Sequence, residues 1–234
     1  MRIIYSLYID IPAEDLDYQR PYSGDTIPKT QRTKLQFIEH YDRLVESHKQ
    51  YAYDISTEYE LFEYDEEYKH FHKTFKEKYP MITDYCIVNF YKIHLLYKLS
   101  KHYDEILYLD FDVIPVTDDD FFDAWNLNKG VAILNNNNDP GLRLKYNIAH
   151  NTLNSSNRSP VAKYWNCKAM LFENGYSIEN DVFNTGIIGI NKVHLDKLDY
   201  FRDFDKTIEL MTTVKNDDAL YPQEVRNMFG YDNE

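Results

Sequence analysis

Two aspartates separated by a single residue, Asp110 and Asp112, follow the apolar run EILYL. Residues two apart in an extended chain point the same way, so both carboxylates face one point provided that the chain stays extended through Phe111. Two carboxylates held that close repel each other unless a cation lies between them. Carboxylate oxygens suit Mg²⁺ or Mn²⁺, and phosphate oxygens of a substrate complete such a site. The pair predicts a divalent-metal site, although aspartates that only cap the turn before Pro115 would look the same.

Alternating strand and helix patterns would position this pair. Runs rich in β-branched and aromatic residues predict strands at 2–9, 59–64, 105–109, 131–135 and 182–192. Amphipathic or apolar runs predict helices at 30–51, 65–79, 84–102 and 118–125, with two short helical patterns after the last strand. Strands alternating with helices indicate an α/β fold with a mainly parallel central sheet flanked by helices. Ligands of such sheets bind at the carboxyl ends of strands, where the two aspartates would lie.

The organisation of the chain is that of one domain. No stretch rich in Pro, Gly or Ser divides the 234 residues, so we expect a single domain over 1–234. The end at Glu234 would also fit the N-terminal part of a longer polypeptide. No run approaches the ~20 apolar residues that cross a bilayer, and the chain begins at once with a strand pattern. We therefore expect no membrane span, no signal peptide and a cytoplasmic location.

The composition restricts the possible partners. With 26 Lys plus Arg against 39 Asp plus Glu, the formal net charge is -13, which repels a polyanion, so we expect no nucleic-acid partner. A small anionic ligand such as a nucleotide would need positive charge, and a divalent cation supplies it. The two cysteines, Cys86 and Cys167, fit no metal-binding spacing and suit a reducing compartment. Abundant Asn, Lys, Ile and Tyr are typical of AT-rich genomes, viral or bacterial.

The two most distinctive runs occur in a fixed order. YLDFDVIPV, preceded by a helix that carries a lysine and followed later by FNTGIIGIN, resembles glycosyltransferases with the single-domain nucleotide-sugar fold called GT-A. The likeness is greatest to the glycogenin and galactosyltransferase family, family eight, and covers Arg2 to about Lys192. It implies an enzyme that moves a hexose from an NDP-sugar, with UDP as the expected nucleotide, to a hydroxyl acceptor such as a glycan. It also implies Mn²⁺ or Mg²⁺ and retention at the anomeric carbon.

The resemblance assigns roles to particular residues. Asp110 and Asp112 match the aspartates that bind the metal and the donor diphosphate, and Asp110 would also touch the ribose or the donor sugar. Lys92 matches the basic residue that meets the donor, although its spacing to Asp110 is longer here than in glycogenin and an exposed helix lysine is the alternative. The expected nucleotide-base site is the end of the first strand, at Ser6, Leu7 and Tyr8. The expected sugar site is the later motif, Asn184, Thr185 and Gly186.

Each of these assignments has a plainer alternative. The Tyr8 ring can stack on uracil, or it can be ordinary core. Gly186 can approach a sugar, or it can supply permissive backbone in a turn. The long polar segment 135–160 would make a reasonable acceptor wall, since amides and aromatic rings hold sugars.

The chain also departs from the family pattern. Family-eight enzymes usually supply a third metal ligand from a His-x-x-Gly-like segment near the carboxyl end, which this sequence lacks; His194 is the nearest candidate, and it can equally start a helix. The acidic residue that often follows the Asn-Thr-Gly strand has four candidates, Asp217, Asp218, Asp232 and Glu234. Inversion with an Asp or Glu as base therefore stays open.

Two other functions fit an α/β sheet of this kind. A nucleotidyltransferase also binds Mg²⁺ with paired aspartates, but it needs a Gly-rich phosphate loop after the first strand, and SLYIDIPAEDLDYQRPYSG supplies none. A non-catalytic carbohydrate-binding domain of the same fold is the second alternative.

Overall fold

A computed structural model of the protein describes residues 1–12, 29–135, 175, 177 and 183–216. Its strands are β1 (Arg2–Tyr8), β2 (Glu58–Glu63), β3 (Glu105–Leu109), β4 (Ala132–Asn135) and β5 (Phe183–Asn191). Its helices are α1 (Lys29–Asp54), α2 (Glu66–Lys78), α3 (Asp84–Leu99), α4 (Phe121–Ala124), α7 (Lys192–Leu198) and α8 (Phe204–Asn216), with a 3₁₀ turn η2 (Leu127–Lys129). Each predicted strand and helix is present, with bounds that differ by a few residues.

The chain divides into two compact units. The first comprises Met1–Ala132 and Thr185–Tyr200, and it contains β1 to β3, most of β5 and helices α1 to α4 and α7. The second comprises Ile133–Asn184 and Phe201–Glu234, and its longest described element is α8. The aspartate pair belongs to the first unit. One domain over 1–234 stays a prediction.

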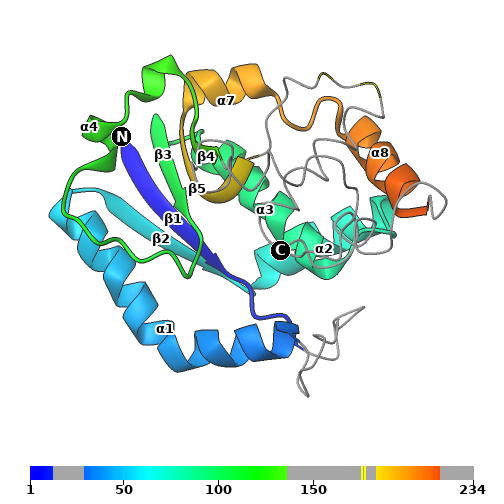
Figure 1. Ribbon diagram of the computed structural model, residues 1–234, viewed down its shortest axis with the longest axis horizontal. Helices are drawn as coiled ribbons and strands as arrows, with labels where there is room; N and C mark the ends of the chain where they lie inside the picture. The colour runs from blue at the N-terminus through cyan, green and yellow to red at the C-terminus, as the bar shows by residue number, and fades with distance from the viewer. Residues whose placement is uncertain (13–28, 136–174, 176, 178–182, 217–234) are drawn as a thin grey trace, which may run out of the picture. The chain divides into compact units, whose positions relative to one another are not determined.

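The strands form one five-stranded sheet in the order β2-β1-β3-β5-β4 (Figure 1). Strand β1 pairs in parallel with β2 and with β3, and β3 pairs antiparallel with β5. The α/β fold with helices flanking a central sheet is thus confirmed, and the sheet is mixed, because β5 runs against β3. The antiparallel register places Leu109 opposite Ile187 and Glu105 opposite Asn191. Ile187 and Gly186 of β5 therefore lie beside the end of β3, where the aspartates follow.

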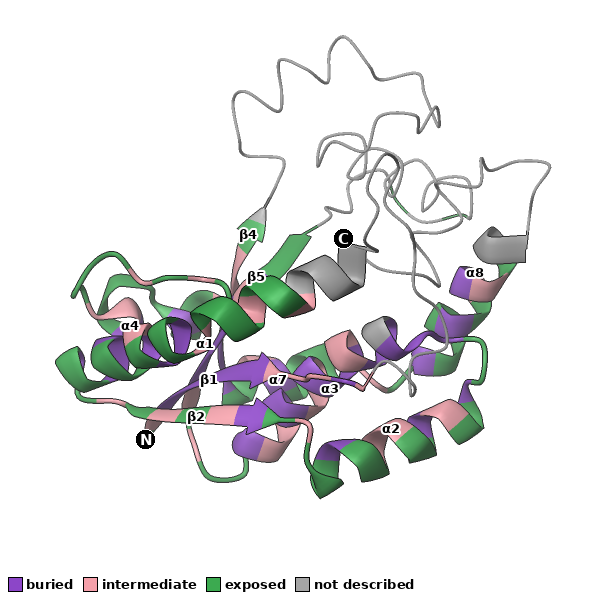
Figure 2. Cartoon of the chain, turned by 90° about the horizontal axis from the view of Figure 1, so that it is seen from below, coloured by how far each residue is buried: buried purple, intermediate pink, exposed green. Residues whose placement is uncertain are grey.

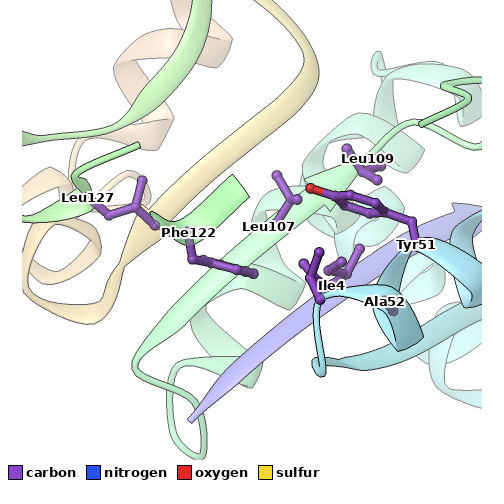
Figure 3. Packing of buried hydrophobic residues seen from close by; sticks show 8 residues of the cluster. Ile4, Tyr51, Ala52, Leu107, Leu109, Phe122 and Leu127 are labelled. Carbon is purple, nitrogen blue, oxygen red and sulfur yellow. The ribbon is translucent and has the colours of Figure 1, made fainter. Parts of the chain in front are cut away.

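One face of the sheet is covered by α1 and α4. Helix α1 is amphipathic, so one side of it is buried against the sheet while the other is exposed (Figure 2). Residues of five elements meet in the core on this face (Figure 3): Ile4, Tyr51, Ala52, Ile55, Leu107, Leu109, Phe122 and Leu127. Burying these side chains contributes roughly 1.5–3 kcal/mol for each large one, which holds α1 against the strands.

The other face is covered by α3, with α2 packed beside it. Helix α3 is mostly buried, as predicted, and its Phe90 stacks on Phe75 of α2 with ring centres 5.2 Å apart. Asp65 caps the start of α2, because its side chain accepts a hydrogen bond from the backbone N–H of Tyr68. Within the described part of the chain, no helix is both long and apolar enough to cross a membrane.

Candidate active site

The side-chain alternation of β3 continues past its last residue. Tyr108 points toward α3, and its ring centre lies 5.0 Å from that of Tyr5, while Leu109 packs in the core beneath α1. Asp110 returns to the α3 side, because its carboxylate accepts a hydrogen bond from the Tyr108 hydroxyl and pairs with Lys92 of α3. The pleat of the strand therefore places the first aspartate beside Lys92, in the middle of α3.

Lys92 is the buried partner of Asp110. Only 4% of its side chain is exposed, and its Nζ lies 3.1 Å from Asp110 Oδ1. The same ammonium donates to the carbonyl oxygen of Thr185 at 3.2 Å and to its hydroxyl at 3.4 Å, and it lies 4.5 Å from the centre of the Tyr108 ring. The alternative of an exposed helix lysine is therefore wrong. Lys92 is buried and contacts the site through its hydrogen bonds to Asp110 and Thr185.

The electrostatics of this group follow from its burial. Burial lowers the pKa of Lys92, and the charges of Asp110 and Asp112 oppose that shift. Burial also raises the pKa of Tyr108 well above its ordinary value, and both aspartates add to the shift. Tyr108 therefore stays protonated and keeps its hydroxyl as a donor. Both aspartates therefore act electrostatically on the same two buried groups.

The Asp-x-Asp run and the Asn-Thr-Gly run meet through the backbone. The backbone N–H of Asp110 donates to the carbonyl of Gly186 at 2.7 Å, which extends the β3–β5 pairing by one residue. Thr185, next to it, accepts the Lys92 hydrogen bonds described above. Residues that are far apart in the sequence, Lys92, Asp110, Thr185 and Gly186, thus form one cluster.

The chain turns directly after Asp110. The backbone N–H of Val113 donates to the carbonyl of Asp110 at 2.9 Å, so Phe111 and Asp112 lie in a turn. An extended chain through Phe111 was the condition for both carboxylates to point the same way, and that condition is not met. The Phe111 side chain is buried against the rings of Tyr8, Phe37 and Tyr41. Asp112 is exposed. The aromatic contacts pull Phe111 inward, and the turn leaves Asp112 at the surface.

The two carboxylates have the right chemistry for a hard divalent cation. Asp110 Oδ2 and both carboxylate oxygens of Asp112 have no hydrogen-bond partner among the described residues, and 39% of the Asp110 side chain is exposed. Oxygen ligands of this kind suit Mg²⁺ or Mn²⁺. No group of three or more His, Cys, Asp or Glu that could hold a metal occurs within the described ranges. The pair fits such an ion only if other oxygen ligands complete its coordination.

The comparisons with known proteins supply the family. The model for glycosyl transferase family 8 matches residues 17–226. The chain belongs to glycosyl transferase family 8. It is therefore an enzyme that transfers a sugar, which decides against a nucleotidyltransferase and against a non-catalytic sugar-binding domain. No curated protein and no solved structure matches the chain.

The remaining predicted residues of this family 8 transferase lie in two environments. At the end of β1, Ser6 and Leu7 are buried, so their side chains face the interior, while Tyr8 is half-buried with its ring centre 4.8 Å from that of Phe111. At the start of β5, Asn184 and Thr185 are exposed and Gly186 is buried. Tyr8 and the β5 motif therefore flank the aspartate turn, at the carboxyl ends of β1 and β3.

Other candidates lie elsewhere or outside the description. His194 lies in the first turn of α7, where its Nε2 lies 3.0 Å from the carbonyl oxygen of Asn128 and its backbone N–H donates to Oδ1 of the capping residue Asn191. Asn191 pairs with Glu105 at the far end of β3, so His194 does not lie with the aspartate turn. Asp217, Asp218, Asp232, Glu234 and segment 136–160 lie outside the described residues.

One residue that contacts the aspartate turn belongs to no recognisable sequence motif. His48 of α1 lies on the buried side of that amphipathic helix, and its Nε2 bonds to the carbonyl oxygen of Val113, just after the aspartate turn. A polar residue on an otherwise apolar helix face was the available signal. The pattern of α1 could show that His48 is buried, but it could not show which residue it meets.

Proposed function

We propose that this transferase takes its sugar from a nucleotide diphosphate donor, a UDP-sugar, and holds Mn²⁺ or Mg²⁺ with Asp110 and Asp112. One observation carries the proposal: Asp110 is held by Lys92 and Tyr108 through Oδ1, which leaves Oδ2 and the exposed carboxylate of Asp112 without partners among the described residues. A cation bound there would supply the positive charge that stabilises a departing diphosphate.

The protein's own residues prepare that site. Lys92 and Tyr108 donate to the same oxygen of Asp110, so they restrict the carboxylate to one orientation before any ligand arrives. The ammonium of Lys92 also offsets one of the two carboxylate charges. The backbone bond from Asp110 to Gly186 ties the aspartate to β5, so the exposed Thr185 hydroxyl lies next to it. We assign the sugar of the donor to this side, against Asn184 and Thr185.

The nucleotide base belongs on the other side of the turn in this proposal. The half-buried ring of Tyr8 lies at the end of β1 beside Phe111, and a uracil ring can stack on an aromatic face of this kind. The Ser6 hydroxyl is completely buried and bonded to His48, so we assign base recognition to Tyr8 and to backbone groups, and not to the Ser6 side chain.

The acceptor is a hydroxyl compound such as a glycan, and the sugar moved is a hexose. A catalytic Asp or Glu, with Asp217 and Asp218 as candidates, would act as a base only if the reaction inverts the anomeric carbon. Retention is the outcome we expect for a member of family 8. The product's anomeric configuration, read by NMR from a reaction that has been stopped early, decides between the two.

The proposal is tested by nucleotide release from a panel of UDP- and GDP-sugars, with Mn²⁺ and with a chelator. We expect release from a UDP-sugar that requires the metal and that is lost in Asp112→Ala. The matched control is Asp118→Ala, which removes another exposed aspartate of the same loop and should release nucleotide at the wild-type rate. Release that persists in the chelator, or in Asp112→Ala, would remove the metal site from the proposal; release from a GDP-sugar alone would remove UDP.

A further inference from the structure

His48 is a completely buried histidine that connects four parts of the fold. It belongs to α1, and its Nδ1 lies 3.1 Å from the Ser6 hydroxyl of β1 and 3.3 Å from the Tyr59 hydroxyl of β2. Its Nε2 lies 2.5 Å from the carbonyl oxygen of Val113, just after the aspartate turn. Every ring nitrogen of this histidine therefore has a polar partner.

The partners determine where the ring proton is. A carbonyl oxygen can only accept, so Nε2 carries the hydrogen and donates it to Val113. In the neutral ring Nδ1 is then an acceptor with one lone pair, to which the hydroxyl of Ser6 or that of Tyr59 can donate. Burial lowers the pKa of His48, which keeps the ring neutral, and burial raises the pKa of Tyr59 to about 12, which keeps its proton on the phenol.

The bond to Val113 completes the support of the turn. Val113 is held twice, because its N–H donates to the carbonyl of Asp110 and its own carbonyl accepts from His48. Asp112 lies between these two points and has no side-chain hydrogen bond among the described residues. The direction of Asp112 is thus set by the backbone on either side of it, and His48 holds one of those sides.

We propose that His48 is a positioning residue of the transferase. Its Nε2–H fixes the turn from Asp110 to Val113, so that the Asp112 carboxylate is presented to a divalent cation and the diphosphate of the donor. This inference rests on the proposed function, because it needs Asp112 to be a metal ligand. It adds that metal and nucleotide binding depend on a side chain of α1 that touches neither of them.

A pair of variants separates this role from ordinary packing. In His48→Gln the amide nitrogen can reach the place of Nε2 and donate to Val113, whereas the shorter side chain in His48→Asn reaches only the place of Nδ1, near Ser6 and Tyr59. We expect His48→Asn to raise the Kd of UDP in the presence of Mn²⁺ by about tenfold, and His48→Gln to stay within about threefold of wild type. Calorimetric titration measures both values, and thermal unfolding shows whether the two variants are equally stable.

The outcomes separate the inference from the proposed function on which it rests. If Asp112→Ala binds UDP and Mn²⁺ like wild type, the proposed function fails. If Asp112→Ala loses binding while His48→Asn keeps it, only the role of His48 fails. Equal losses in His48→Asn and His48→Gln, in step with equal losses of stability, would reduce His48 to a packing residue.

A measurement on the unaltered protein covers the case in which the variants do not fold. Nitrogen-15 spectra of the imidazole rings identify the protonated nitrogen of each histidine, and selective labelling with the known sequence assigns His48. We expect the Nε2–H form, unchanged when Mg²⁺ and UDP are added. A hydrogen on Nδ1 instead would break the bond to Val113 and overturn the inference.

Discussion

Replacing Asp110 by alanine would leave a buried lysine without its counter-charge. Lys92 is 4% exposed and has Asp110 as its ion-pair partner at 3.1 Å, with Thr185 supplying the other acceptors. Burial already lowers the pKa of Lys92 although Asp110 is present, so the pair does not fully offset the cost of removing the ammonium from water. Without Asp110 that cost remains and the attraction is gone, so the folded state should lose stability.

The magnitude follows from how far the pair is buried. Removing one partner of a fully buried ion pair costs about 3–5 kcal/mol. The Asp110 side chain is 39% exposed, so water already screens part of the interaction, and we expect a loss of about 2 kcal/mol. For a chain of this length each kcal/mol shifts the melting temperature by about 2–4 °C. The expected decrease in Tm for Asp110→Ala is therefore about 4–8 °C.

Two further variants make the measurement decisive. Asp112→Ala removes an exposed carboxylate, so its Tm should stay within about 2 °C of wild type, although both aspartate variants should lose metal-dependent transfer. Adding Lys92→Met to Asp110→Ala removes the stranded charge and should recover about half of the lost Tm. A melting temperature for Asp110→Ala equal to that of wild type, or a double variant no more stable than the single one, would refute this account of the pair.

Three other perturbations test the fold around the site. Gly189→Ala puts a methyl 2.4 Å from the Phe121 ring, so urea unfolding should show a loss of about 1–2 kcal/mol that Phe121→Leu partly restores; no loss would contradict the packing. Asp65→Ala removes the cap of α2 and should cost about 1 kcal/mol, whereas Asp65→Asn should cost less. Burial lowers the pKa of His94, so the unfolded chain binds more protons below about pH 6.5 and stability falls there; Tm measured across that range should fall less steeply in His94→Phe.

The local pattern of the sequence predicted the strand before the aspartates and the broad burial of α3. The run EILYL is β3 residue for residue, and the alternation along it also places Tyr108 and Asp110 on one face. The pattern could not show that the side chain of Lys92 is buried. A lysine on a mostly apolar helix is equally consistent with an exposed position, and only the packing of α3 under the end of β3 brings its ammonium to Asp110.

The turn at Phe111 and the direction of β5 could not be predicted from the sequence, for different reasons. Alternation in EILYLDFD continues formally through Asp112, but the rings of Tyr8, Phe37 and Tyr41, all distant in sequence, draw Phe111 into the core while a hydrogen bond closes the turn. The hydrophobic pattern of a strand reads the same in both directions, so nothing in FNTGIIGIN shows that it runs antiparallel to β3. Each of these features depends on a long-range partner.

The charge balance of the site unites these observations. In a chain of net charge -13, two neighbouring carboxylates are costly unless positive charge is near. The ammonium of Lys92 supplies one positive charge, and it offsets Asp110 through Oδ1, which leaves Oδ2 of that carboxylate open. The pair then keeps about one negative charge, which is enough to attract a divalent cation yet leaves the loaded site positive toward a diphosphate. Without the lysine, a divalent cation would only neutralise the two carboxylates, and the loaded site would not attract a diphosphate. Under the proposed function, the buried Lys92 therefore lets an acidic protein bind an anionic donor.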